Sequence, residues 1–208
     1  MQGKGILLVV SGPSGVGKGT ICSQLLQKLN NVQYSVSVTT REPRPGEVNG
    51  VSYFFIKVDE FCRMREAGEL LESAEVFGNL YGTPRPAVMQ ALEQGKDVVL
   101  EIDIQGALQV KVAFPECVTV FVWPPSHAEL QRRIRQRGTE SPEALLRRLR
   151  EAKREMAHVV DYDYVVINHP GQVEVAVEGM RAIIQAEKSR VARHIPWLEH
   201  VLREVSSC

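Results

Sequence analysis

A glycine-rich stretch near the start of the chain carries the residues of a phosphate-binding loop. Residues 9–20 read VVSGPSGVGKGT, in which Gly12, Gly17 and Lys18 follow the spacing glycine, four residues, glycine, lysine. Glycines let several backbone N–H groups approach a phosphate, and the lysine places a point charge between the β- and γ-phosphates. The pattern fails at Gly19, where a serine or threonine usually offers its hydroxyl to Mg²⁺. By itself the loop predicts a nucleoside triphosphate or similar ligand.

A second group of candidate residues lies in the stretch 39–53, TTREPRPGEVNGVSY. Arg41 and Arg44 are flanked by rigid prolines, so their guanidinium groups could clamp a phosphate in the bidentate manner that arginine favours. Tyr53 could add a phenolic hydrogen bond. Two arginines in a loop are more often simply solvated, so this stretch alone leaves both interpretations open.

The third group is an arginine-rich stretch, residues 132–150, RRIRQRGTESPEALLRRLR. A nucleic-acid groove is disfavoured because the chain has a formal net charge of zero and this stretch has no interleaved aromatic residues. Some of the arginines are expected on solvated helix faces, namely Arg132, Arg135, Arg147 and Arg150. The others suit a mobile lid that turns at Gly138, supplies positive charge to a phosphoryl group and excludes water.

Four apolar runs, residues 6–10, 97–103, 117–123 and 163–168, are predicted strands buried on both faces. Helical patterns separate them, including one that begins near Lys18, so a parallel sheet with right-handed crossovers follows. Ser126 and Glu129 form a predicted capping box, and Pro142 is expected at the first position of a helix. A long amphipathic helix is predicted over about residues 173–194.

Residues 34–90 do not fit this alternation, because they read as strand, irregular loop and strand with glycine and proline at the turns. We interpret them as an inserted lobe with a mixed sheet. The 208 residues, of which 44% are hydrophobic, are expected to form a single domain. The four cysteines are scattered, and the first apolar run is too short for a signal peptide or a membrane span, so a cytoplasmic protein without nucleic-acid or membrane partners is expected.

Five motifs in order give the chain a resemblance to the guanylate kinase family over about residues 5–190. They are SGPSGVGKGT, SVTTREPRPGEVNGVSYFF, ESAEVFGNLYGT, VVLEIDIQGA and RRIRQRGTES. The resemblance implies transfer of the γ-phosphate of ATP to GMP, with Mg²⁺ as cofactor. It also implies a three-layer α/β P-loop kinase fold with a parallel core sheet, a GMP-binding lobe at 34–90 and a helical lid region at 126–158.

The resemblance assigns roles to matching positions. The expected ATP site comprises Gly12, Pro13, Ser14, Gly15, Val16, Gly17, Lys18, Gly19, Thr20 and Arg133. The GMP phosphate is expected on Arg41, Arg44, Tyr53 and Tyr81, and guanine on Ser37, Glu72, Thr83 and Glu101. The residues expected to act in catalysis are Lys18, Arg41, Asp103 and the lid arginines Arg137 and Arg148.

The chemistry of guanine explains the expected role of Glu72. Guanine presents N1–H and N2–H₂ donors side by side, and one carboxylate can accept from both, whereas adenine would turn a lone pair toward it. An exposed helix or loop acid is the competing interpretation of Glu72, and Thr83 could cap a helix opening at Pro84 in place of its guanine contact or in addition to it.

Three positions depart from the family. Gly19 resembles the Gly-Lys-Gly-Thr loop of adenylate kinases, and Glu101 stands where some members have aspartate. After the last predicted strand, NHPGQ replaces a more acidic run, and Asn168 there could approach the adenine. Because Gly19 lacks a hydroxyl and Thr20 is turned about 100° from it, we expect Asp103 to hold the metal through water.

The sequence leaves two alternatives to this function open. One is a related P-loop kinase that phosphorylates another acceptor, and the other is a guanylate-kinase-like scaffold that binds peptides. The intact Lys18, the clamp arginines and the lid arginines together favour an enzyme over a scaffold. The sequence carries no signal for the oligomeric state.

Overall fold

The computed structural model describes residues 4–76, 78–136 and 142–205. Its core is a five-stranded sheet in the order β2-β7-β1-β8-β9, in which every neighbouring pair is parallel. The strands are β1 (Leu7–Ser11), β2 (Val32–Tyr34), β7 (Asp97–Glu101), β8 (Val118–Trp123) and β9 (Tyr164–Ile167). This arrangement confirms the predicted parallel core sheet.

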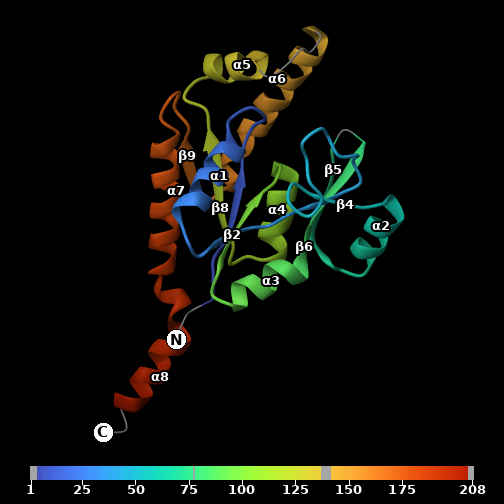
Figure 1. The fold of residues 1–208 in the computed structure, drawn as a ribbon. Helices are drawn as coiled ribbons and strands as arrows, with labels where there is room; N and C mark the ends of the chain where they lie inside the picture. Colours follow the sequence, from blue (N-terminus) through green and yellow to red (C-terminus); the bar gives the residue numbers. More distant parts are fainter. Residues whose placement is uncertain (1–3, 77, 137–141, 206–208) are drawn as a thin grey trace.

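Helices cover both faces of the sheet, which gives the three predicted layers (Figure 1). The helices of this part are α1 (Lys18–Lys28), α3 (Arg85–Glu93), α4 (Ile104–Ala113) and α7 (Val173–Lys188). Leu8 and Val10 of β1 pack on the face covered by α1 and α7. Leu7 and Val9 pack on the opposite face, with α3 and α4. Burial on both faces explains why β1 is an unbroken apolar run rather than an alternating one.

The predicted lobe has a second, four-stranded sheet in the order β4-β3-β6-β5. Its elements are β3 (Val38–Thr39), β4 (Phe54–Phe55), α2 (Val58–Glu66), β5 (Leu70–Val76) and β6 (Asn79–Pro84). The sheet is mixed as predicted, because β3 pairs parallel with β4 and antiparallel with β6. A small apolar cluster of Val38, Phe61 and Leu70 holds helix α2 against this sheet.

Two helices from the predicted lid region lie beyond the same end of the core sheet (Figure 1). They are α5 (His127–Gln136) and α6 (Pro142–Met156), and the 3₁₀ helix η1 (Ala157–Asp161) follows α6. Pro142 begins α6 as expected. Ser126 accepts a hydrogen bond of 3.1 Å from the backbone N–H of Glu129, which is one half of the predicted capping box, while the Glu129 carboxylate accepts from Arg132 and Arg133. Gly138, the predicted turn, lies outside the described residues.

Two predicted elements end differently in the structure. The strand predicted to reach residue 103 stops at Glu101, because Asp103 is the N-cap of α4 and its carboxylate accepts from the N–H of Gly106 at 2.7 Å. The long helix predicted to residue 194 stops at Lys188, where Arg193 turns back onto the buried carboxylate of Glu187.

The chain continues after α7 through the 3₁₀ helix η2 (Val191–Arg193) into helix α8 (Ile195–Val205). This helix extends away from the body of the molecule (Figure 1). Across the described residues, none of the helices combines the length and the apolar character needed to cross a membrane.

Candidate active site

The phosphate-binding loop joins β1 to α1 as the sequence predicts. Gly12 has a φ of 144°, and a Cβ there would lie 2.4 Å from the carbonyl oxygen of Val122, so only glycine fits. Gly17, with a φ of 100°, is the N-cap of α1 and leaves the first helical N–H groups without a side-chain cap. Those N–H groups and the positive end of the helix dipole therefore remain available to an anion.

Lys18 points back into the loop that contains it. Its Nζ donates to the carbonyl oxygen of Gly12 at 2.6 Å and lies 3.5 Å from that of Pro13. Burial lowers the pKa of Lys18, and the nearby carboxylate of Glu101 opposes that effect. The carbonyl contacts only partly compensate the buried ammonium group of Lys18. A phosphate bound in the loop would give this group an anionic partner.

Arg133 connects the lid region to the loop. Its guanidinium donates to the carbonyl oxygens of Val16 and Asn168, each at 2.9 Å, while Nε donates to Glu129 at 2.7 Å. The buried amide of Asn168 donates to the same Val16 oxygen at 2.8 Å, and its Nδ2 is 2.5 Å from where a Cβ on Gly17 would lie. Both predicted residues thus border the loop.

Arg148 and Glu155 of α6 meet the other side of the loop, at Ser14. Nη2 of Arg148 donates to the Ser14 hydroxyl at 2.9 Å, and the Ser14 N–H donates to Glu155 at 3.2 Å. Burial raises the pKa of Glu155. The other predicted lid arginine, Arg137, lies outside the described residues. Arg132, Arg135, Arg147 and Arg150 are exposed, as predicted.

Arg41 is the centre of a polar cluster in the lobe. Its Nη2 is 2.9 and 3.0 Å from the two carboxylate oxygens of Glu47, and its Nε donates to the hydroxyl of Tyr81 at 3.2 Å. The guanidinium carbon lies 5.5 Å from the centre of the Tyr53 ring. Three of the four predicted phosphate contacts are therefore together around one guanidinium.

The fourth predicted contact, Arg44, has an exposed side chain, and its backbone N–H donates to Glu47 at 2.8 Å. Hydrogen bonds from Arg41 and Arg44 lower the pKa of Glu47. Sequence reasoning did not select Glu47, although it stands in the same motif. The signal was an acid six residues after Arg41 across a Pro-Gly turn, which brings the two charges together.

Glu72 and Thr83 form the buried pair of the lobe. The Thr83 hydroxyl donates to Oε1 of Glu72 at 2.7 Å, and burial raises the pKa of Glu72 to about 7. The alternative role of Thr83 as a helix cap is wrong, because Pro84 is the N-cap of α3 and makes no side-chain cap hydrogen bond. Ser37, the remaining lobe residue predicted for guanine, accepts from the Phe54 N–H through its backbone carbonyl at 2.9 Å.

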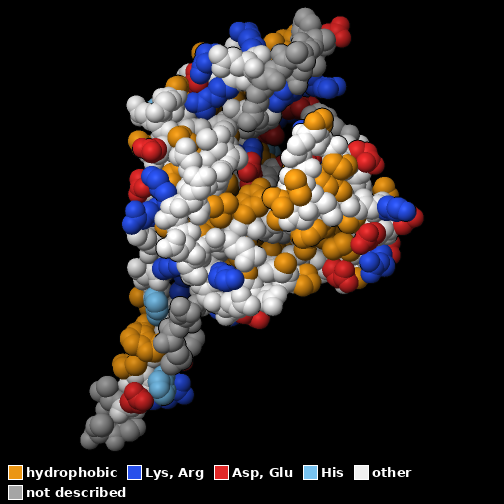
Figure 2. Space-filling view, viewed as in Figure 1, with side chains coloured by type: hydrophobic (Ala, Val, Ile, Leu, Met, Phe, Trp, Pro, Cys, Tyr) orange, Lys and Arg blue, Asp and Glu red, His pale blue; other side chains and the backbone are white. Residues whose placement is uncertain are grey.

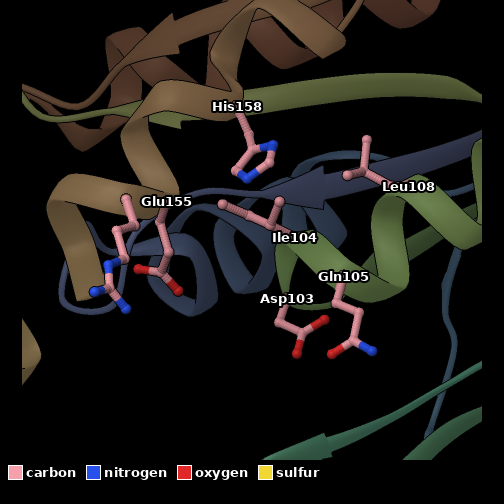
Figure 3. Close-up of a pocket in the computed structure, with 7 residues that line it drawn as sticks. Asp103, Ile104, Gln105, Leu108, Glu155 and His158 are labelled. Atoms are coloured by element: carbon pink, nitrogen blue, oxygen red, sulfur yellow. The ribbon is translucent and has the colours of Figure 1, made fainter.

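Asp103 borders a cavity of about 400 Å³ between α4 and α6. The lining residues are Asp103, Ile104, Gln105, Leu108, Arg154, Glu155 and His158. Asp103 and Glu155 come from different helices, and their carboxylates point toward the same side (Figure 3). One oxygen of Asp103 is already bonded to the Gly106 N–H, so this residue caps a helix and faces the cavity at once.

Glu101 ends strand β7 beside the phosphate-binding loop. Both of its carboxylate oxygens lie 3.5 Å from where a Cβ on Gly19 would be. Among the charged groups around Lys18, Glu101 has the largest effect on the pKa of Lys18, which it raises. Burial, and then the charge of Glu101, raise the pKa of Tyr34 of β2, a residue that sequence reasoning did not select. Glu101 therefore lies beside the loop at Gly19, while its predicted guanine contact stays a prediction.

The surface between the lid helices and the lobe is hollowed, with basic side chains along the lid margin (Figure 2). The loop with Lys18 follows the carboxyl end of β1 in the core sheet, whereas the Arg41 cluster and the Glu72–Thr83 pair belong to the lobe. Ligands of open parallel sheets bind at this end of the strands. The glycine-rich loop with Lys18 could hold a triphosphate, and the lobe combines the Arg41 guanidinium with the buried carboxylate of Glu72.

Comparison with known proteins gives a consistent result. The family model described as guanylate kinase matches residues 4–187. The guanylate kinase of Desulfitobacterium hafniense is 55% identical over 192 residues, which are 92% of this chain and 95% of that protein. The guanylate kinase of Lactococcus lactis is 49% identical over 205 residues and 99% of each chain. The crystal structure of guanylate kinase from Anaplasma phagocytophilum superposes with a TM-score of 0.76 at 37% identity, covering 92% of this chain and 90% of that one.

Proposed function

This chain belongs to the guanylate kinase family, and from that premise we propose a role for each part of its site in the transfer of the γ-phosphoryl group of ATP to GMP. The products are ADP and GDP. The observation that carries the assignment of the acceptor is the buried Glu72–Thr83 pair in the same lobe as the Arg41 cluster. A carboxylate for the base and a guanidinium for the phosphate are the two recognition elements that GMP requires.

The acceptor site binds GMP through charge and hydrogen bonds. Glu72 accepts from the N1–H and N2–H₂ groups of guanine, with Thr83 orienting the carboxylate and Ser37 and Glu101 as further predicted contacts. Arg41, Arg44, Tyr53 and Tyr81 bind the phosphate. A mismatched base leaves Glu72 buried against a lone pair, which costs about 1–3 kcal/mol.

The donor site binds ATP through the loop, residues 12–20, with Lys18 on the β- and γ-phosphates. Arg133 stabilises the loop from the lid side. Arg137 and Arg148 are proposed to neutralise charge on the transferring group. No residue has to act as a strong base, because the attacking oxygen of GMP is already anionic, so positioning and charge neutralisation suffice.

We further propose Mg²⁺ as the cofactor. The carboxylates near the loop fit it, since Mg²⁺ prefers oxygen ligands and keeps several waters, and both Glu101 and Asp103 follow the end of strand β7. Asp103 has one oxygen bonded to Gly106, which leaves the other for a water of the metal. When bound, the metal neutralises charge on the phosphates.

The experiment is an assay of ADP release with saturating MgATP and GMP, AMP or no acceptor. We expect rapid ADP release with GMP, and Glu72→Ala should lower kcat/KM for GMP by roughly 10²-fold and narrow its lead over AMP. Equal release with AMP, or release without an acceptor, would contradict the proposed acceptor. Glu75→Ala, at an exposed position on the same strand, is the matched control.

A further inference from the structure

The position of Gly19 faces a carboxylate and nothing closer. A Cβ built on Gly19 has as its three nearest atoms Oε1, Oε2 and Cδ of Glu101, at 3.5, 3.5 and 3.9 Å. A serine at this position would turn its hydroxyl into the same small volume. The carboxylate of Glu101 therefore lies beside the place where phosphate-binding loops usually hold their hydroxyl oxygen.

From this geometry we propose that Glu101 provides the oxygen ligand for Mg²⁺ that the loop lacks at Gly19. The proposal rests on the proposed function, because it concerns the metal that accompanies ATP in that reaction. The missing hydroxyl at Gly19 and the carboxylate of Glu101 then become one compensated pair. A glutamate carries its carboxylate one methylene, about 1.5 Å, further than an aspartate at the same position.

The surroundings of Glu101 fix the direction of its side chain. It is the last residue of β7, and the pairing of Val10 with Glu101 places it next to the strand that leads into the loop.

The charges around this position also suit a metal. Lys18 supplies the positive charge on the loop side, and the negative charges of Glu101 and Asp103 both act on it. A metal with the triphosphate would thus be placed between phosphates and the two acids at the end of β7. The carboxylate of glutamate is negatively charged, whereas the hydroxyl that it replaces is neutral, so the loss of that hydroxyl is offset.

The test is a metal titration of the protein saturated with ADP, without GMP and without turnover. Mn²⁺ serves as the probe and its binding is followed by electron paramagnetic resonance, with Mg²⁺ as competitor. We expect Glu101→Asp to weaken metal binding by about 10- to 100-fold. We expect Gly19→Ser to change it by less than about threefold. The double variant Gly19→Ser/Glu101→Asp should recover most of the loss, since the hydroxyl then takes the position that the shortened acid leaves.

Two controls separate this role from others. Glu75→Asp removes the same methylene from an exposed glutamate and should leave metal binding unchanged. Binding of ADP in the presence of EDTA should be unaltered in Glu101→Asp. A loss of equal size with EDTA would overturn the proposal, because Glu101 would then act on the nucleotide or the fold rather than on the metal.

The remaining outcomes of the titration also decide whether Glu101 is a metal ligand. If Glu101→Asp binds Mn²⁺ like the parent, or if the double variant stays as weak as the single one, the proposal is wrong. If GMP binding without metal weakens while Mn²⁺ binding is unchanged, Glu101 belongs to the acceptor site. A parent protein that fails to phosphorylate GMP contradicts the proposed function, while the titration with ADP still measures the ligand role of Glu101.

Discussion

Thr83 donates a hydrogen bond of 2.7 Å to the carboxylate of Glu72, and both side chains are buried in the lobe. Burial raises the pKa of Glu72 to about 7, the charge of Asp103 contributes to the same shift, and the hydrogen bond from Thr83 opposes it. The ligand-free site therefore changes its charge near neutral pH. Guanine needs the ionised form, because only that form accepts from both donors.

The binding of GMP should consequently weaken as the pH falls through 7. With a pKa of about 7, the ionised fraction falls about fivefold between pH 7 and pH 6, and the Kd for GMP should rise accordingly. Calorimetric titration between pH 5.5 and 8.5 measures this. In the Glu72→Gln variant the GMP phosphate still titrates, but the part of the pH dependence of the Kd that comes from Glu72 should be lost. An unchanged pH profile in that variant would show that another group titrates.

The same shift predicts how stability depends on pH. A carboxyl whose pKa is raised from 4.5 to about 7 by folding stabilises the native state below pH 4.5, and this contribution is lost as the pH rises toward 7. Glu72→Gln removes the ionisation, so its Tm relative to the parent should increase from pH 5 to pH 8. Thermal unfolding without ligand at both pH values is the measurement, and a constant difference would contradict the assigned pKa.

Lysine at position 133 should not preserve the stability and the ATP binding that Arg133 provides. Its fork holds the carbonyl oxygens of Val16 and Asn168 together, and an ammonium group cannot donate in both directions with the same geometry. We expect Arg133→Lys to lower the free energy of unfolding by about 2–4 kcal/mol, from hydrogen bonds to a charged group, and to weaken ATP binding. Urea unfolding and ATP titration test this. Arg132→Lys, at the exposed neighbour, should have little effect on either quantity.

Arg148 should act on the rate more than on acceptor binding. It reaches the loop at Ser14, and we expect Arg148→Ala to lower kcat by about 10²- to 10³-fold, as for the loss of one charge contact in the transition state. The Kd for GMP alone should barely change. Arg147→Ala, at the exposed adjacent position, is the matched control. Weak GMP binding with a nearly normal kcat would place Arg148 at the acceptor instead.

The two roles of Asp103 can be separated by substitution. Asparagine caps helices about as well as aspartate, so Asp103→Asn should keep the stability of α4, whereas Asp103→Ala should lose about 1 kcal/mol. Both variants should require more Mg²⁺ for half-maximal kcat/KM. Thermal unfolding and a Mg²⁺ titration of activity measure the two effects. If Asp103→Asn leaves the Mg²⁺ requirement unchanged, Asp103 is only a helix cap.

Sequence patterns were sufficient where the physical requirement is local. The loop at 12–18 was predictable because its glycines need unusual backbone angles and its lysine has a fixed spacing from them. The core strands were predictable because burial on both faces requires continuous apolar runs, as in β1. The start of α6 at Pro142 and the cap at Ser126 likewise depend on neighbouring residues only.

The tertiary structure decided which of these residues meet. The sequence also suited Thr83 to cap a helix, and only the pairing of β5 with β6 brings its hydroxyl to Glu72. Gly19 and Glu101 are 82 positions apart, and they lie close together because β7 pairs in parallel with β1 in one register. Contacts of this kind depend on sheet order, register and side-chain length together, so no short stretch of sequence determines them. The charged groups of the site therefore acquire their partners only when the chain has folded.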